Sequence, residues 1–378
     1  MLPGLLLAAL TLAAAPAAEP ALLIGLLLPP EESAAASLRQ GAELGILHAN
    51  DLPGPKVGLI VRGRPGQWGD DGAEAARMVL DDGARGLIAP PDGAASHLSL
   101  QVAGRTAIPV VSLCGDSSVT GAGIPWMVRL APKTSDEART LFGVAAVWRP
   151  PPSSQPSPQT NGGARPSPAR RYAAVVPDGR AGREIARDLE AAAIAAGCRL
   201  EPPLPVATNR SDFTQVVREV LKSKPDSVLL WLDSPGRAGR MVAEFRRSGF
   251  KGELAGPGRL RCAEFLQAAA EAAEGFLVPG LVLDPASEDE LRRFTRAYRE
   301  RFRAEPDNAA AQCYDAARLL VHVLRQAGGE TAHRAFPLTE TLPGATGPLS
   351  FDHEGNRRST LNLLVCRNGN FTLRPAKN

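Results

Sequence analysis

The stretch Gly86–Ser112 (GLIAPPDGAASHLSLQVAGRTAIPVVS) constrains the fold most, because it predicts a strand, a tight loop, a helix and a second strand. Its apolar runs Gly86–Ala89 and Ile108–Ser112 have the length of buried parallel strands. Between them, apolar residues recur at helical spacing. Ligands of open parallel sheets bind just beyond the carboxyl ends of the strands. We therefore expect the loops Pro90–Ala94 and Leu113–Ser118 to lie together at a binding edge.

The same alternation of strand and helix continues along most of the chain. Leu22–Leu28 is an uninterrupted apolar run that predicts the first strand, and the helical pattern after it continues to Asn50. Further on, we expect Thr134 to cap a helix that ends near Trp148, and Gly347–Gly355 to give a strand and a tight turn. Strict strand–helix alternation is typical of parallel sheets, so the sequence predicts an α/β fold.

Length and composition narrow the class of protein. The chain has 378 residues, enough for two domains with well-buried cores. Its formal charge is +3 and only 5% of its residues are aromatic, so we expect no nucleic-acid or membrane-surface partner. The five cysteines form no C-x-x-C pair, so we expect no zinc or other metal site and no redox cofactor.

The first residues have the pattern of an export signal. Leu2–Ala18 is an apolar run that ends in small residues, and Ala15-Pro16-Ala17 fits a cleavage site. The run is short for a membrane span, and no cysteine follows it to accept a lipid. We expect a signal peptide over residues 1–18 and a free protein in the periplasm or outside the cell. The run contains no Lys or Arg, which leaves an uncleaved anchor or an apolar tail as alternatives.

A proline-rich segment divides the chain near its middle. Arg149–Arg170 contains seven prolines and shows no apolar periodicity, so it has no apolar face to bury in a core. It lies where one α/β unit ends and another begins. We therefore interpret residues 149–169 as a linker or as an insertion in a boundary loop.

Two segments after this linker share the string GRAGR, namely Val175–Arg183 and Leu232–Arg240. Each carries a strand end, an Asp and then a helix. One explanation is that every α/β unit needs glycine and polar residues at such a turn. The other is an anion site, in which two helix N-termini and the guanidinium groups of Arg180 and Arg237 meet at the binding edge.

No catalytic motif stands out in the sequence. Neither a Walker A string nor G-x-G-x-x-G is present, and Gly115-Asp116-Ser117 does not continue as a G-x-S-x-G elbow because residue 119 is Val. The histidines lie far apart, and His322 and His333 are interpreted as surface or cap residues. We therefore expect a protein that is not an enzyme, although scattered carboxylates could still assemble a site in the fold.

The order of the pieces resembles the Leu/Ile/Val-binding protein family, the type I periplasmic substrate-binding proteins of ABC transporters. The opening strand and helix are similar in IGLLLPPEESAAASLRQGAELGILHAND, and the next helix, strand and loop in GAEAARMVLDDGARGLIAPPDGAAS. Further matching segments are VRLAPKTSDEA, FRRSGFKGELAGPG, AAEGFLVPG and DAARLLVHVLRQAG followed by GPLSFDHEGNRR. The series is collinear over nearly the whole chain after the signal.

This resemblance implies two α/β lobes, each a parallel sheet flanked by helices, joined by three crossings and closing on a ligand by a hinge. Lobe 1 would comprise residues 21–148 and 283–343, and lobe 2 residues 170–282 and 344–376. The implied function is to bind a solute for an ABC-type importer. The implied partners are a small-molecule ligand and membrane permease subunits, with the protein itself a monomer.

The ligand positions depart from the amino-acid-binding pattern of the family. The Tyr-Gly of its second lobe is replaced by Ala181-Gly182, and the acidic residue after its Gly-Pro is replaced by Gly258-Arg259. With Arg180 and Arg237 nearby, this pattern favours a small polar ligand, anionic or amino-acid-like. The expected ligand-binding residues are Asp92, Gly93, Ser96, Asp116, Ser117, Ser118, Arg180, Arg183, Asp233 and Arg237. The alternative is a sensory or partner-binding module of the same fold with a degenerate ligand site.

Overall fold

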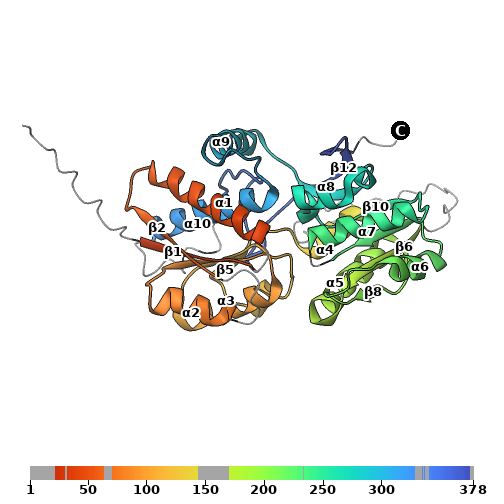
Figure 1. The fold of residues 1–378 in the computed structure, drawn as a ribbon. Helices are drawn as coiled ribbons and strands as arrows, with labels where there is room; N and C mark the ends of the chain where they lie inside the picture. Colours follow the sequence, from red (N-terminus) through yellow and green to blue (C-terminus); the bar gives the residue numbers. More distant parts are fainter. Residues whose placement is uncertain are drawn as a thin grey trace, which may run out of the picture.

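The computed structural model describes residues 22–29, 32–63, 70–143, 170–232, 234–327, 334, 336 and 340–374. These residues form two α/β lobes that lie side by side (Figure 1). The two-lobed α/β fold predicted from the sequence is therefore confirmed. The expected signal peptide, residues 1–18, and the proline-rich segment, residues 149–169, lie outside the described residues.

Lobe 1 is built on a parallel five-stranded sheet with the order β2-β1-β3-β4-β5. Its strands are β1 (Leu22–Leu27), β2 (Val57–Arg62), β3 (Gly86–Ala89), β4 (Val110–Ser112) and β5 (Met127–Arg129). The central strand β3 is buried along its whole length, as its apolar sequence GLIA predicts. In the register of this sheet, Ala89 is paired with Ser112. Strands β3 and β4 therefore end at the same level, and the loops that follow them start side by side.

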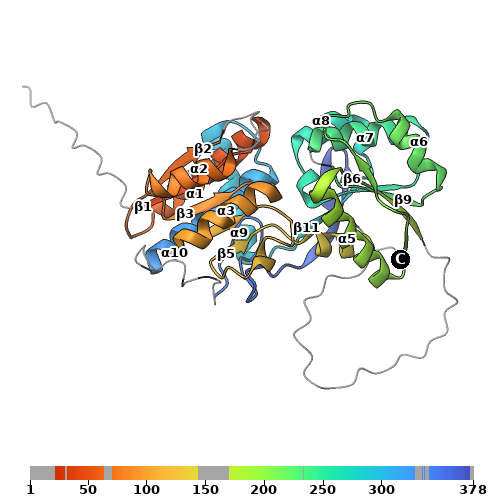
Figure 2. The same ribbon diagram turned by 90° about the horizontal axis from the view of Figure 1, so that it is seen from below.

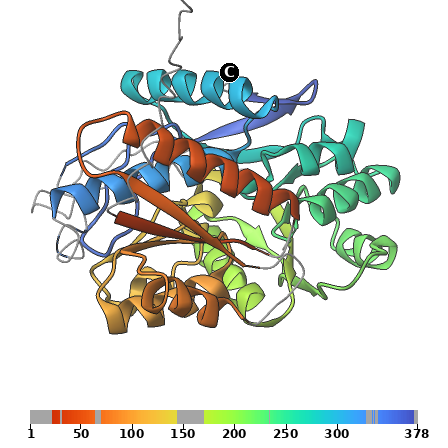
Figure 3. The ribbon, with the colours of Figure 1, turned by 60° about the vertical axis from the view of Figure 1, so that its left-hand side comes forward.

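Helices cover both faces of this sheet. They are α1 (Glu32–Asn50), α2 (Asp71–Leu80), α3 (Gly93–Thr106), α9 (Pro285–Phe302) and α10 (Asn308–Gln326), with a short 3-10 helix η1 (Thr120–Ala122) after β4. Helices α1 and α10 lie along one face and α2 and α3 along the other (Figure 3). Helix α9 packs on α1 and α10 through a separate aromatic cluster that includes Phe294, Tyr298 and Tyr314. Each face therefore has its own apolar core.

Two glycines bring α1 and α10 into close contact. A Cβ atom at Gly41 would lie 2.1 Å from the carbonyl oxygen of Ala310, and one at Gly45 would lie 2.6 Å from that of Tyr314. Real Cβ atoms do not approach backbone atoms this closely, so only glycine fits at either position. This requirement explains both glycines of the GAELG string in the resemblance.

Lobe 2 is built on an eight-stranded sheet. Its strands are β6 (Arg171–Pro177), β7 (Arg199–Leu200), β8 (Leu204–Val206), β9 (Ser227–Leu230), β10 (Glu253–Ala255), β11 (Leu277–Leu281), β12 (Leu361–Arg367) and β13 (Asn370–Leu373). The order is β13-β12-β11-β10-β9-β6-β7, with β8 also paired to β6. Strands β6 to β11 pair in parallel, whereas β12 and β13 pair antiparallel, so the sheet is mixed where a parallel one was expected.

The helices of lobe 2 also lie on both faces of their sheet (Figure 2). They are α4 (Thr134–Leu141), α5 (Gly179–Ala196), α6 (Thr214–Lys222), α7 (Pro235–Arg247) and α8 (Ala263–Ala269), with the 3-10 helices η2 (Gly258–Leu260) and η3 (Ala270–Ala273). Helices α6, α7 and α8 pack on one face around Phe245 and Phe265. Helices α4 and α5 pack on the other face.

The boundaries between the lobes differ from the expected ones. Helix α4 packs against α5 in the core of lobe 2, so the first crossing lies at about residues 130–133 and not near 148. Leu349 and Phe351 belong to the core of lobe 1, so the third crossing lies at about residues 357–360 and not near 343. Between β11 and α9, residues 282–284 connect the two lobes a second time.

Two expected elements also differ in detail. The helix at Thr134 begins at that residue, with Lys133 in the cap position, and ends at Leu141, beyond which residues 144–150 are outside the described part. The segment Gly347–Gly355 forms isolated bridges, such as Leu342 with Leu349, where a strand was expected. The segment packs on lobe 1 and is held by these backbone bonds and by the side-chain bonds described below.

Candidate functional site: the facing edges of the two lobes

The loop after β3 is fixed by the start of α3. Asp92 is the N-cap of α3, and its Oδ1 accepts a hydrogen bond of 2.7 Å from the backbone N–H of Ala95. At Gly93, a Cβ atom would lie 2.8 Å from Asp116 Oδ2. The loops after β3 and β4 therefore touch, as the parallel register predicts.

Ser96 lies behind this edge and does not face solvent. Its side chain is completely buried. Its Oγ lies 2.9 Å from Ser112 Oγ and donates a 3.3 Å bond to the carbonyl oxygen of Pro90. These bonds tie the loop after β3 to the end of β4. Ser96 is one of the expected ligand residues, but its hydroxyl forms hydrogen bonds inside lobe 1.

The loop after β4 carries a polar cluster. Asp116 Oδ1 accepts hydrogen bonds from the backbone N–H and the Oγ of Ser118, at 2.9 and 2.7 Å. His97, on α3, places its Nε2 2.9 Å from Ser118 Oγ and 3.6 Å from Asp116 Oδ2. Both His97 and Asp116 are partly exposed, so the cluster lies at the surface of the lobe.

One hydrogen bond joins this cluster to the other lobe. Ser117 Oγ donates to Asp188 Oδ2 on α5 over 3.2 Å. Burial raises the pKa of Asp188, and the nearby carboxylates of Asp116 and Glu184 act in the same direction. Figure 2 shows α5 on the side of lobe 2 that faces β5 and α3. The carboxylates of Asp116 and Asp188, one from each lobe, are therefore close enough to act on each other.

A completely buried arginine lies beneath the same loop. Arg129, the last residue of β5, donates from Nη1 to the carbonyl oxygen of Gly115 over 2.9 Å and from Nη2 to Asn356 Oδ1 over 2.5 Å. It thereby links the loop after β4 to the turn that precedes the third crossing. Its positive charge also lies close enough to lower the pKa of Asp188 in part, against the larger effect of burial.

The two GRAGR segments have different surroundings. Arg180 is exposed and pairs with Glu184 one turn along α5, at 3.3 Å. Arg237 is buried, and its Nη2 donates to the carbonyl oxygens of Ala207 and Arg210, at 2.6 and 3.2 Å. One arginine therefore faces solvent and the other holds the loop before α6.

The glycines that follow in the two segments have a shared packing role. A Cβ atom at Gly182 would lie 1.7 Å from the carbonyl oxygen of Pro177, and one at Gly239 would lie 2.7 Å from that of Phe265. Close helix packing accounts for these glycines without a ligand, which favours the structural explanation of the repeat. Of the remaining expected residues, Arg183 is exposed on α5 and Asp233 lies outside the described residues.

The loop after β10 is held from within lobe 2. Glu137, on α4, accepts a 2.8 Å hydrogen bond at Oε1 from the backbone N–H of Gly258, and Arg259 donates to the carbonyl oxygen of Leu232. Burial raises the pKa of Glu137 to about 7. An acidic side chain thus does lie at this loop, but it comes from a distant helix and not from position 259.

The crossings run side by side and are joined by hydrogen bonds. The N–H of Val282 donates to the carbonyl oxygen of Thr360 over 2.9 Å. Arg357, which is buried, donates to Leu130, Gly347 and Pro348 carbonyl oxygens and to Thr346 Oγ1. Burial lowers the pKa of Arg357 to about 10. This arginine therefore connects the first crossing to the third.

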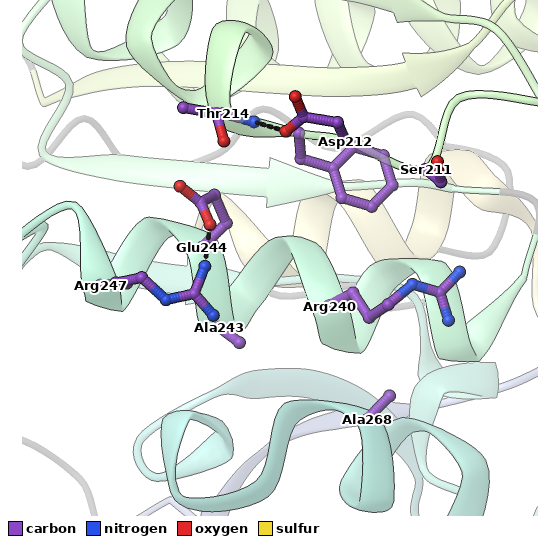
Figure 4. Close-up of a pocket in the computed structure, with 9 residues that line it drawn as sticks. Ser211, Asp212, Thr214, Arg240, Ala243, Glu244, Arg247 and Ala268 are labelled. Atoms are coloured by element: carbon purple, nitrogen blue, oxygen red, sulfur yellow. Dashed lines mark hydrogen bonds and ion pairs between the residues drawn. The ribbon is translucent and has the colours of Figure 1, made fainter.

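A separate groove lies on the flank of lobe 2, between α6 and α7 (Figure 4). It has a volume of about 320 Å³ and is lined by Phe213, Arg240 and Arg247 among others. Arg247 pairs with Glu244, and Asp212 accepts a bond from the N–H of Thr214. Two of its charged groups, Arg247 and Glu244, thus pair with each other.

The described residues contain no group of three or more metal-ligating side chains. Within the same ranges, no helix is long and apolar enough to cross a bilayer. The five cysteines all lie in the described part and are free thiols there, three of them buried.

The sequence of residues 24–361 matches the family model described as periplasmic binding protein. The chain belongs to this family. The resemblance to the Leu/Ile/Val-binding type is therefore confirmed, and the general role of such proteins is to bind solutes. No curated protein has a sequence that matches this chain.

Solved structures of periplasmic binding proteins share the fold of this chain. A leucine-binding protein from Thermotoga maritima is similar with a TM-score of 0.79 at 17% identity, over 94% of this chain and 98% of that one. A branched-chain amino acid-binding protein from Streptococcus pneumoniae, in complex with isoleucine, has a TM-score of 0.77 at 16% identity over 93% and 97%. A solute-binding protein from R. palustris, in complex with benzoate, has a TM-score of 0.77 at 17% identity over 93% and 95%.

Sequence reasoning did not single out Asp188, Arg129, His97 or Glu137 in this periplasmic binding protein. Asp188 is in the middle of an amphipathic helix, where an acidic residue on a partly exposed face carries no local signal. Arg129 could have been noticed, because an arginine that ends an otherwise apolar strand needs a buried partner. The role of Glu137 depends on a contact with Gly258, far away in sequence, which no local pattern encodes.

Proposed function

We propose that this periplasmic binding protein delivers a small polar solute bearing an ammonium group to a membrane ABC permease, and that it holds this solute between its lobes. The observation that carries the ligand class is that the carboxylates of Asp116 and Asp188, one from each lobe, lie close enough to repel each other. A cation between two carboxylates relieves their repulsion, whereas an anion there adds to it. The hydroxyls of Ser117 and Ser118 lie beside the pair and offer further polar contacts.

This ligand class differs from the anionic one that the arginines favoured in the sequence. Arg180 is paired with Glu184, and Arg237 and Arg259 donate to backbone carbonyl oxygens of lobe 2. An arginine that is already satisfied by carbonyl oxygens loses those bonds if it turns to an anion. We therefore base the proposed charge of the ligand on the carboxylates between the lobes and not on the arginines.

A thermal-shift screen tests the proposal. The panel contains amines and diamines, amino acids, and carboxylates that lack an amine, such as benzoate. Because a ligand stabilises the native state by mass action, about 2.7 kcal/mol at one hundred times Kd, a bound solute raises Tm. We expect shifts from compounds with an ammonium group, lost in Asp116→Asn and retained in Glu219→Gln, which changes an exposed carboxylate on α6. A shift from carboxylates alone would contradict the ligand class.

A panel without any shift would instead favour a partner-binding module with the same fold.

We also propose that residues 1–18 direct export and are removed, so that the protein works in the periplasm or outside the cell. N-terminal sequencing of the exported protein tests this. A start near residue 18 or 19 is expected, and a retained Met1 would contradict cleavage.

A further inference from the structure

The carbonyl oxygen of Gly115 accepts hydrogen bonds from both ends of the first crossing. Arg129, at the end of β5, donates to it from Nη1 over 2.9 Å. Thr134, the first residue of α4, donates to it twice, from its N–H and from its Oγ1, each over 3.1 Å. Three donors therefore share an acceptor that has two lone pairs. This acceptor directly precedes Asp116–Ser118 in the loop after β4.

We propose that the carbonyl group of Gly115 is a joint that couples the arrangement of the two lobes to the shape of the loop after β4, with Arg129 and Thr134 as positioning residues. The inference rests on the proposed function only in taking Asp116–Ser118 as part of the solute site. Its test uses no solute, so the two can fail separately.

The first turn of α4 is bound to both lobes. Thr134 contacts lobe 1 through Gly115, whereas Glu137 accepts the N–H of Gly258 in lobe 2 over 2.8 Å. Three residues of α-helix rise only about 4.5 Å, so the change from one lobe to the other takes place within this turn. Beyond it, Ala138 is buried in the core of lobe 2. A rotation of lobe 2 therefore acts on Gly115 through a short, regular piece of helix.

Lobe 1 holds the other side of the joint. The backbone of Arg129 donates to the carbonyl oxygen of Gly355 over 2.8 Å and accepts from the N–H of Arg357 over 3.2 Å. Its side chain reaches Asn356 between them. Arg129 is completely buried, and burial of a charged group against neutral acceptors costs free energy that an apolar side chain would not. This cost favours a role for the arginine in positioning.

The first crossing also packs against the loop after β4. A Cβ atom at Gly115 would lie 3.4 Å from the carbonyl oxygen of Pro132 and 3.3 Å from Thr134 Oγ1. The ring of Pro132 fixes its φ angle and so limits how the crossing bends. Movement of the crossing is therefore transmitted to the loop by packing as well as by hydrogen bonds.

Amide hydrogen exchange in the full chain without solute tests the joint. Thr134→Val removes the hydroxyl donor and keeps the N–H and the shape of the side chain. We expect residues 113–119 to exchange about two- to fivefold faster, as for the loss of one neutral hydrogen bond. Thr134→Ser restores the hydroxyl and should restore slow exchange. Thr140→Val is the matched control and should leave the loop unchanged, because Thr140 Oγ1 donates to Asp136 within α4 itself.

A second variant removes the donor that comes from lobe 1. Arg129→Met takes away the buried charge and keeps a long side chain, and both acceptors retain another donor, from Thr134 and from Thr120. We therefore expect Tm to stay close to that of the wild type while residues 113–119 exchange faster. An arginine with a purely structural role would instead lower Tm. Because both donors act on one oxygen, the two changes combined should exceed the product of their single effects.

Single-molecule energy transfer between dyes on the two lobes tests the connection to lobe arrangement. Suitable sites are Leu80 on α2 and Ile194 on α5, which are 70% and 79% exposed, with dyes attached through non-natural residues. The distribution of distances should widen in Thr134→Val and return to the wild-type width in Thr134→Ser. Circular dichroism establishes that each variant is folded.

Three results would overturn the proposal. The first is exchange of residues 113–119 in Thr134→Val at the wild-type rate. The second is an equal effect of Thr140→Val on this loop, since both hydroxyls would then act only by stabilising α4. The third is an unchanged distance distribution in Thr134→Val, which would separate the loop from the arrangement of the lobes.

Discussion

Several charged side chains at the edge of lobe 2 act on the backbone and not on solvent. Arg237 holds two carbonyl oxygens before α6, Arg259 holds the carbonyl oxygen of Leu232, and Glu137 holds the N–H of Gly258. Hydrogen bonds that involve a charged group contribute more to stability than neutral ones. These residues therefore fix the loops of this edge before any solute arrives.

Glu137 predicts a dependence of stability on pH. The pKa of this buried carboxyl group is raised from 4.5 to about 7, so the folded state binds the proton more tightly than the unfolded chain. Its contribution to stability is complete below pH 4.5 and is lost as the pH rises towards and through 7. At about 1.4 kcal/mol per pKa unit, roughly 2 to 3 kcal/mol should be lost between pH 5 and 8.

Urea unfolding at these two pH values measures the effect. Glu137→Gln keeps the acceptor for Gly258 but carries no charge, so its stability should change less between pH 5 and 8. Equal pH dependence in the variant and the wild type would show that Glu137 does not titrate in this range.

A second prediction at this scale concerns Gly182. A Cβ atom there would lie 1.7 Å from the carbonyl oxygen of Pro177, so Gly182→Ala must displace α5 from the end of β6. Overpacking of this kind costs about 1 to 3 kcal/mol, which a shift in the urea midpoint would report. Gly121→Ala is the matched control, because nothing lies within 4 Å of a Cβ atom there. Similar losses in both variants would contradict the packing argument.

At the scale of elements, helix starts are fixed by aspartates that bond to the first turn. Asp92, Asp284 and Asp307 cap α3, α9 and α10, each accepting from a backbone N–H three residues on, at 2.7 to 2.8 Å. Asp307 also accepts a 2.8 Å bond from Ser37 Oγ on α1. The cap of α10 therefore also sets the position of α1 relative to α10.

The two caps of α9 and α10 should differ in their effect. Asp284→Ala is expected to cost about 1 kcal/mol of unfolding free energy, which is typical for the loss of an N-cap. Asp307→Ala should cost more, about 1 to 2 kcal/mol, because the bond from Ser37 is lost as well. Urea unfolding of both variants, with the exposed Asp289→Ala as control, measures the difference. A smaller loss at Asp307 than at Asp284 would rule out the role of Ser37.

At the scale of the whole molecule, a buried polar cluster connects α10 to the segment that leads into the third crossing. Asp315 of α10 accepts bonds from the N–H of Ala345 and from the N–H and Oγ1 of Thr346, at 2.6 to 2.8 Å. Thr346 Oγ1 in turn accepts from Arg357, which reaches the first crossing at Leu130. One carboxylate of lobe 1 thus anchors the segment that connects both lobes.

Removal of this carboxylate should weaken the whole molecule. In Asp315→Ala, two buried N–H groups lose their acceptor and Arg357 loses its nearby negative charge. Leaving a buried charge uncompensated costs about 3 to 5 kcal/mol, and we expect Tm to fall accordingly. Glu354→Ala, an exposed change near the same crossing, is the control. If both variants melt as the wild type does, the segment is held by other contacts.

The sequence predicted the fold well because local patterns carry it. Apolar runs such as Gly86–Ala89, and the collinear series of family strings, depend only on neighbouring residues. The candidate site was harder to predict from the sequence than the fold. Arg180 and Arg237 stand in the same string, yet one pairs with Glu184 at the surface and the other is buried against carbonyl oxygens, because their surroundings come from other parts of the chain. Asp188 could be recognised only from its hydrogen bond with Ser117, which lies on the other lobe.

The packing of α10 on α1 has a consequence for the order in which the molecule is made. The face of the first sheet that α1 and α10 share is completed by residues 308–326, which leave the ribosome after nearly all of lobe 2. Until then, the core around Leu38 and Ile88 lacks a large part of its cover. Lobe 1, whose strands are synthesised first, therefore completes its core only after nearly all of lobe 2 has been made.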